Sequence, residues 1–229
     1  MERFIVDPGE FAEHAERWIC NKIQLVLESQ QRCNLMLAGG ATPLPIYQRL
    51  AQRGDIPWLR INLYFGDERC VPLNTQESNY STVMNSLFPD GDRPEGMSVF
   101  RMCGEEDPDK AAEVYELVLP ERIDILLLGV GDDGHTASIF PGSAVLDEEK
   151  RRVMPAIATK PPLQRLTITP PVIQSARYLL VMVQGDEKAD AVRSALVNHN
   201  VPAAIALDGD WMMDVRAARS LPADQRLGF

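Results

Sequence analysis

The apolar positions of this chain form two patterns that alternate along its length. In residues 10–30 they recur every three or four positions, which is the spacing of one face of an amphipathic helix. The positions that set this spacing are Phe11, Ala15, Trp18, Ile19, Ile23, Val26 and Leu27. Elsewhere they form short continuous runs such as IDILLL at 123–128, which is typical of a strand buried on both faces of a sheet.

This alternation predicts an α/β fold. Further helices are expected at 42–53, late in 74–88, at 107–120, at 186–199 and around 211–221. Further strands are expected at 33–40, at 60–71, within 89–102 and at 178–185, with additional runs at 152–158, 165–177 and 201–207. Strands that alternate with helices favour a mostly parallel, Rossmann-like sheet covered by helices on both faces. No linker or repeat interrupts the pattern, so we expect one domain over residues 1–229.

The acidic composition limits what the chain is expected to bind. Its 33 acidic and 23 basic residues give a net charge of -10, which argues against nucleic acid or an anionic membrane as a partner. An anionic ligand would then need a local cluster of basic side chains. The charged N-terminal segment lacks the apolar core of a signal peptide, and no run approaches the ~20 apolar residues of a membrane span. We expect a cytoplasmic monomer or weak homo-oligomer.

The cysteines predict neither a disulfide framework nor a metal centre. Cys20, Cys33, Cys70 and Cys103 are widely spaced, form no C-x-x-C pair, and share the chain with only three histidines. We therefore expect four reduced thiols, no metal and no cofactor.

Four expected strands end in the same way. LMLAGGATP, LYFGDERCV, LLLGVGDDGH and LVMVQGDEK each pass from apolar residues through glycine to polar or charged residues. Because the carboxyl ends of parallel strands share the sheet edge where α/β proteins bind ligands, we expect these ends to form one site. A glycine-rich turn before a helix, several cations and one histidine suit a phosphorylated small molecule.

His135 is the expected centre of the chemistry. It follows the buried run 123–128 through a glycine-rich turn that is expected to lead into a helix, and Asp133 is placed to fix its tautomer or raise its basicity. The alternative is a histidine that caps or packs against that helix, and this segment alone favours neither.

The other candidate residues have structural alternatives too. Gly39 and Gly40 can form only a turn, because their spacing matches neither the dinucleotide fingerprint nor the P-loop. Residues 67–69 can be a solvated charge cluster, Lys188 a surface residue in the first turn of a helix, and Arg165 a solvent-facing strand residue. Taken together, these alternatives are weaker, because each would have to be true of residues that are expected to lie at the same edge of one sheet.

Four blocks of the chain resemble the 6-phosphogluconolactonase family, within a wider group that includes glucosamine-6-phosphate deaminases and ribose-5-phosphate isomerases. LAGGATP is similar to its glycine-rich loop, GDERCVPLNTQESNY to its D-E-R-x-V-P block, and RLTITPPVIQSAR to its arginine-containing block. GVGDDGHTASIFPG is similar to the highly specific signature G-x-G-x-D-G-H-T-A-S-x-F-P. The first block departs from the pattern because serine is common where Ala38 and Ala41 stand, which leaves Thr42 and backbone N–H groups for phosphate.

The resemblance implies hydrolysis of the δ-lactone of 6-phosphogluconate in the pentose phosphate pathway. It implies His135 as general base on water and Asp133 as the residue that positions it. Arg69 is implied to hold the substrate or to stabilise the developing negative charge. The residues expected to bind the substrate or its phosphate are Gly39, Gly40, Thr42, Asp67, Gly134, Arg165 and Lys188.

Two other functions fit part of this pattern. A glucosamine-6-phosphate deaminase or isomerase shares the fold, but its D-G-H-I-A-F-N-E-P motif carries a glutamate where Phe140 stands, so an acid for ring opening is absent. A non-catalytic sugar-phosphate sensor does not need His135 beside Asp133. A regulator also normally carries a DNA-binding module, for which this acidic chain has no room.

Overall fold

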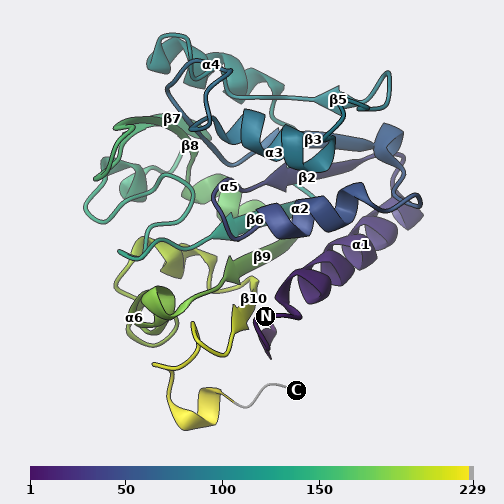
Figure 1. Ribbon diagram of the computed structural model, residues 1–229. Coiled ribbons are helices and arrows are strands. Elements are labelled where there is room, and N and C mark those ends of the chain that lie inside the picture. Colours follow the sequence, from purple (N-terminus) through teal and green to yellow (C-terminus); the bar gives the residue numbers. More distant parts are fainter. Residues whose placement is uncertain (227–229) are drawn as a thin grey trace.

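The main sheet has seven strands, all parallel, in the order β1-β10-β9-β6-β2-β3-β5 (Figure 1). These strands are β1 (Arg3–Val6), β2 (Cys33–Leu37), β3 (Ile61–Phe65), β5 (Ser98–Val99), β6 (Ile125–Gly129), β9 (Tyr178–Val183) and β10 (Asp210–Asp214). The computed structural model describes residues 1–226 of the chain. The predicted fold class, a mostly parallel α/β sheet, is confirmed.

Helices cover both faces of this sheet, because alternate strand residues point to opposite sides. Leu35 and Leu37 pack with α1 (Phe11–Ser29), α2 (Leu44–Ala51) and α3 (Asn79–Leu87), which lie over one face in Figure 1. Met36 points into a second core, which is completed by α4 (Pro108–Val118), α5 (Pro170–Ser175) and α6 (Ala189–Arg193). Among the described residues, no helix combines the length and apolar character needed to cross a membrane.

A second, antiparallel sheet was not predicted. It has three strands in the order β4-β8-β7, namely β4 (Asp67–Arg69), β8 (Gln164–Ile168) and β7 (Val153–Ile157), and β7 and β8 lie beside α4 (Figure 1). The expected strand at 60–71 is divided at Gly66, where the chain passes from one sheet to the other. The N–H of Gly66 donates to the carbonyl of Leu37 in the main sheet, and its carbonyl accepts from Ile168 in the small one.

The C-terminal part of the chain differs most from expectation. The helix expected around 211–221 is wrong, because Asp210–Asp214 form β10, a strand between β1 and β9. Trp211 and Met213 enter one core and Met212 the other, which is the burial of an inner strand. The helix expected at 186–199 is divided into three short segments of different helical type.

Short helical segments occupy several connections. They are the 3₁₀ turns η1 (Trp58–Arg60), η2 (Ala144–Asp147), η3 (Asp186–Lys188), η5 (Pro202–Ala206) and η6 (Ala223–Gln225), and the π-helical turn η4 (Ser194–Asn198). The apolar run at 201–207 therefore folds as the turn η5.

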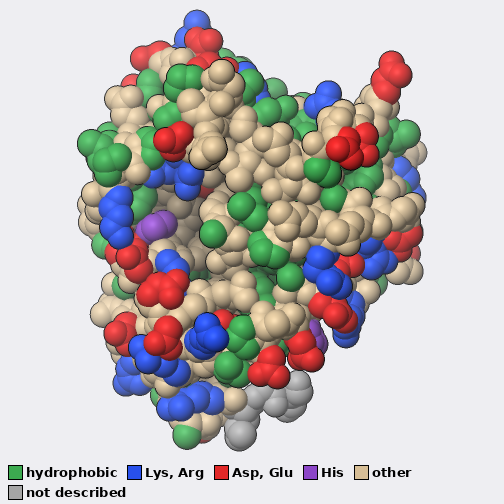
Figure 2. Space-filling model, in the orientation of Figure 1, with side chains coloured by type: hydrophobic (Ala, Val, Ile, Leu, Met, Phe, Trp, Pro, Cys, Tyr) green, Lys and Arg blue, Asp and Glu red, His purple; other side chains and the backbone are tan. Residues whose placement is uncertain are grey.

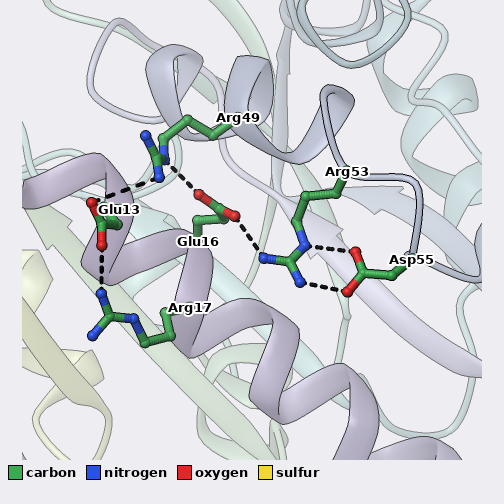
Figure 3. A network of polar contacts seen from close by, with 6 residues as sticks. All are labelled: Glu13, Glu16, Arg17, Arg49, Arg53 and Asp55. Atoms are coloured by element: carbon green, nitrogen blue, oxygen red, sulfur yellow. Dashed lines mark hydrogen bonds and ion pairs between the residues drawn. The ribbon is translucent and has the colours of Figure 1, made fainter.

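An ion-pair network joins the first two helices (Figure 3). The carboxylate of Glu16 on α1 is buried and accepts hydrogen bonds from Arg49 on α2 and, at 2.9 Å, from Arg53 beyond the end of α2. Arg53 also pairs with Asp55. Burial raises the pKa of Glu16, but the hydrogen bonds from Arg53 and Arg49 outweigh it and hold that pKa below its ordinary value. The network fixes α2, whose N-terminus lies at the sheet edge described next.

Candidate active site

A cleft of about 400 Å³ lies at the carboxyl edge of the main sheet. Segments that follow β2, β3, β6 and β9 meet there, as predicted, and β8 of the small sheet forms a further wall. Figure 2 shows a hollow on this face with a histidine and several basic side chains at its rim. The predicted site residues that line the cleft are Gly39, Gly40, Thr42, Asp67, Arg69, Asp133, His135, Arg165 and Lys188.

His135 and Asp133 form a pair in the loop after β6. Nδ1 of His135 lies 2.5 Å from Oδ1 of Asp133, and the same oxygen accepts a hydrogen bond of 3.0 Å from the backbone N–H of His135. With its proton on Nδ1, the imidazole presents Nε2 as the nitrogen available to water. The capping alternative is wrong, since turns and a single bridge between Thr136 and Ile139 follow instead of the expected helix.

Two glycines shape this loop. A Cβ on Gly131 would lie 2.1 Å from the imidazole of His135, so only glycine lets the ring lie against the backbone there. Gly134 has φ +82°, and a Cβ on it would meet Val201 at 2.5 Å. Gly134 faces Val201 and does not line the cleft. Its predicted contact with substrate is therefore not supported, and its role is to turn the backbone.

The glycine-rich loop after β2 packs against the start of α3. A Cβ on Gly39 would fall 2.1 Å from Oδ1 of Asn79, and Gly40 has φ +87°, a left-handed conformation that favours glycine. Helix α2 begins two residues after Thr42, and no side chain caps its N-terminus. The N–H groups of Leu44 and Ile46 already donate to backbone carbonyls, and Pro45 has no N–H group. The backbone N–H groups of the preceding glycine-rich loop, together with the hydroxyl of Thr42, are therefore the donors suited to an anion.

The carboxylates that follow Gly66 are buried. Asp67 is 9% exposed, and its carboxylate accepts hydrogen bonds from Nδ2 of Asn79 at 2.9 Å and from Oγ of Ser138 at 2.7 Å. Glu68 is 2% exposed and accepts hydrogen bonds from the backbone N–H groups of Asn79 and Tyr80 at the start of α3. Burial raises the pKa of Glu68 despite these bonds. A solvated cluster is thus wrong for these two residues.

Asn79 and Ser138 were not predicted as site residues. Both lie in blocks that the resemblance singled out, ESNY and HTAS, so a signal was present in the sequence. Their roles depend on Asp67, which is 12 residues from Asn79 and 71 from Ser138. No local pattern reveals contacts of that range.

Two arginines lie side by side at the cleft. Arg69 on β4 and Arg165 on β8 are direct partners in the antiparallel register. Arg165 is 8% exposed, so the solvent-facing alternative is wrong, and burial together with the charge of Arg69 lowers its pKa. Nε of Arg69 is buried and has no hydrogen-bond partner among the described residues. Like charges placed directly opposite are unfavourable, so this pair is suited to an anionic ligand.

Two lysines add further positive charge to the lining of the cleft. Lys188 lines the cleft from η3, after β9. Lys160, which was not predicted, lines it from the loop between β7 and β8, and its Nζ lies 2.9 Å from Oδ2 of Asp132. Within residues 1–226, no three His, Cys, Asp or Glu side chains gather as a candidate metal site.

Comparisons with known proteins give one consistent result. Residues 6–213 match the family described as glucosamine-6-phosphate isomerases/6-phosphogluconolactonase. The chain is 31% identical to a 6-phosphogluconolactonase from Mycobacterium leprae, over 91% of this chain and 93% of the relative. It is 35% identical to a 6-phosphogluconolactonase from Mycobacterium tuberculosis, over 82% of this chain and 85% of the relative.

The fold is similar to that of solved structures from a bacterium and a trypanosome. The 6-phosphogluconolactonase of Thermotoga maritima superposes with a TM-score of 0.83 at 28% identity, covering 93% of this chain and 99% of that one. The 6-phosphogluconolactonase of Trypanosoma brucei superposes with a TM-score of 0.84 at 28% identity, covering 96% of this chain and 98% of that one.

Proposed function

Because the chain belongs to the glucosamine-6-phosphate isomerase/6-phosphogluconolactonase family, we propose that it hydrolyses 6-phosphogluconolactone to 6-phosphogluconate. The observation that carries this proposal is the His135–Asp133 pair, which lies in a cleft rich in cations at the carboxyl edge of the sheet. Lactone hydrolysis requires an activated water, a stabilised oxyanion and a held substrate. Each requirement has a candidate side chain in this cleft.

The proposed reaction begins with His135. Asp133 accepts the Nδ1 proton and fixes the tautomer, so that Nε2 removes a proton from water as its oxygen attacks the lactone carbonyl. The tetrahedral intermediate then collapses, and the bond between the carbonyl carbon and the ring oxygen breaks. The imidazolium returns its proton to the departing ring oxygen, which becomes a hydroxyl group, and the other product group is a carboxylic acid.

The cations divide between the two ends of the substrate. Arg69, whose Nε has no partner within residues 1–226, is assigned to the developing oxyanion or to holding the lactone. Arg165, Lys188, Thr42 and the backbone N–H groups around Gly40 are assigned to the phosphate, because charged donors and oriented backbone N–H groups bind phosphate strongly. Asp67, held by Asn79 and Ser138, is assigned to substrate binding.

Phe140 argues against the deaminase alternative. Its ring lies 4.6 Å from that of His135 and is buried, so an apolar group occupies the place where the deaminase motif carries a glutamate. A non-catalytic sensor of sugar phosphates would not need the His135–Asp133 pair, because binding alone requires no general base.

The test is acid release from freshly prepared 6-phosphogluconolactone, measured against its spontaneous hydrolysis. We expect His135→Ala to lower turnover by roughly 10²–10⁴-fold, the usual contribution of a general base, with little change in ligand affinity. His14→Ala on α1, outside the cleft, is the matched control. Near-normal turnover of His135→Ala would rule out this base.

A further inference from the structure

The ion pair between Lys160 and Asp132 joins two separate parts of the cleft. Lys160 belongs to the loop between β7 and β8 of the small sheet, whereas Asp132 precedes Asp133 in the loop after β6 of the main sheet. Both residues line the cleft, and their charged atoms are 2.9 Å apart. The proposed mechanism uses neither of them.

The fold does not depend on this ion pair. The side chain of Lys160 is 74% exposed and that of Asp132 48% exposed. Ion pairs this open to water contribute little to stability, because solvent screens them and both side chains lose conformational freedom. The pair therefore holds the Lys160 ammonium group at the mouth of the cleft without locking it there.

The surrounding charges give the pair a role in ligand binding. The hydrogen bond from Lys160 lowers the pKa of Asp132, and the nearby charge of Lys188 acts in the same direction, so Asp132 is ionised at neutral pH. An ionised Asp132 at the mouth repels an incoming phosphate unless Lys160 neutralises it. A phosphate dianion is also a stronger partner for an ammonium group than a carboxylate monoanion.

We propose that Lys160 determines specificity for phosphorylated ligands by exchanging Asp132 for the phosphate group when the ligand enters. In the free protein Asp132 acts as a positioning residue, which keeps Lys160 over the cleft. This proposal rests on the proposed function, because it takes the phosphorylated lactone and its product as the ligands. It adds a mobile cation to the fixed pair Arg69 and Arg165.

The experiment is calorimetric titration with 6-phosphogluconate, the stable product, and with gluconate as the ligand that lacks phosphate. Lys160→Met should weaken binding of 6-phosphogluconate about tenfold, as expected for loss of one partly exposed charged contact. Asp132→Asn should strengthen it severalfold, because Lys160 then leaves no partner. The double variant should recover part of the affinity lost in Lys160→Met, because it removes the repulsion by Asp132, but it should still bind more weakly than the unsubstituted protein. Gluconate binding should not change in any of these variants.

Two matched variants exclude nonspecific effects. Lys110→Met removes an exposed lysine of α4 outside the cleft and should leave both affinities unchanged. Lys160→Arg keeps the positive charge and should retain most of the affinity for 6-phosphogluconate. In turnover assays, Lys160→Met should raise KM for the phosphorylated lactone with kcat unchanged.

Several results would overturn the inference. The inference fails if Lys160→Met leaves the Kd for 6-phosphogluconate unchanged or weakens gluconate binding equally. It also fails if Asp132→Asn fully restores affinity in the Lys160→Met background, or if the unsubstituted protein does not bind 6-phosphogluconate. Restoration would mean that Lys160 only neutralises Asp132. Absence of lactone hydrolysis together with the expected pattern of Kd values would overturn the proposed function alone.

Discussion

Arg69 and Arg165 show how single residues make the free site favourable for an anion. Arg69 and Arg165 are register partners on β4 and β8, so their positive charges repel, and burial of Arg165 limits the screening of that repulsion by water. A phosphate or oxyanion between or beside them removes the repulsion. Part of the binding free energy therefore comes from relief of the repulsion between these two arginines.

Replacement of Arg165 should separate phosphate binding from catalysis. We expect Arg165→Ala or Lys188→Ala to raise KM for 6-phosphogluconolactone by an amount equivalent to roughly 1.5–3 kcal/mol, the value of a hydrogen bond to a charged group. Turnover of unphosphorylated gluconolactone should barely change. Steady-state kinetics on the two lactones provide the measurement, and Arg216→Ala, an exposed position outside the cleft, provides the control. If activity fell equally on both lactones, these cations would instead be assigned to the reacting carbonyl or to stabilisation of the fold.

Residue types and their local motifs identified much of the candidate site from the sequence. His135, Asp133 and Arg69 stand out because charged groups follow buried apolar runs through glycine, whereas Arg165 lies within a strand-like run and was singled out by the resemblance. Lys160 does not stand out, since it lies in a polar loop and gains its position only when β7 and β8 pair beside the loop after β6. Gly134 was expected to bind the substrate from the resemblance, but it does not line the cleft, and a Cβ placed on it would collide with Val201.

At the scale of elements, apolar runs were better guides than helical periodicity. The inner strands β2, β6 and β9 were predicted because they are short apolar runs covered on both faces. The run WMMD was mistaken for part of a helix because charged and alanine residues follow it at helical spacing. The division at Gly66 was missed because nothing in the local pattern distinguishes a strand that continues from one that changes sheet.

The network around Glu16 makes the packing of α1 on α2 sensitive to pH. The pKa of Glu16 is lower in the folded protein than its ordinary value, so the carboxylate stabilises the fold at pH values above that ordinary pKa. This contribution is lost as the pH falls through the folded pKa. We expect Glu16→Gln to lower the free energy of unfolding by roughly 1–3 kcal/mol at neutral pH, since the arginines lose a buried charged partner.

Urea denaturation at neutral and acidic pH measures this effect. The difference between Glu16→Gln and the unsubstituted protein should shrink at acidic pH, where Glu16 itself becomes protonated. Glu13→Gln, at an exposed position of the same network, should change stability by no more than about 1 kcal/mol. A difference that stays constant with pH would show that Glu16 contributes through packing rather than charge.

At the scale of the whole molecule, the net charge of -10 opposes the charge of the cleft. An acidic protein repels a phosphorylated substrate at long range, and this repulsion is screened within about 10 Å at moderate salt. Capture therefore depends on the cations gathered at the sheet edge. The affinity should be concentrated in few residues, which is why single substitutions in the cleft have large expected effects.

Hydrolysis should survive thorough chelation. The proposed reaction uses a histidine base and protein cations, and the chain offers no cysteine pairs or histidine cluster suited to a catalytic ion. The measurement is acid release before and after exhaustive treatment with EDTA, with the protein returned to chelator-free buffer. Loss of activity that a divalent metal restores would contradict the mechanism.

The change of sheet at Gly66 places part of the substrate-binding lining on the small sheet, while Thr42 and Lys188 remain in loops of the main sheet. Arg69, Lys160 and Arg165 belong to the small sheet and its loop, whereas His135 and Asp133 belong to a loop of the main sheet. Exchange of the β7–β8 hairpin would thus alter which lactones are captured while the water-activating pair stays in place. Substrate range can in this way diverge among descendants of one ancestral hydrolase, or be redirected by a graft, through a segment of fewer than twenty residues.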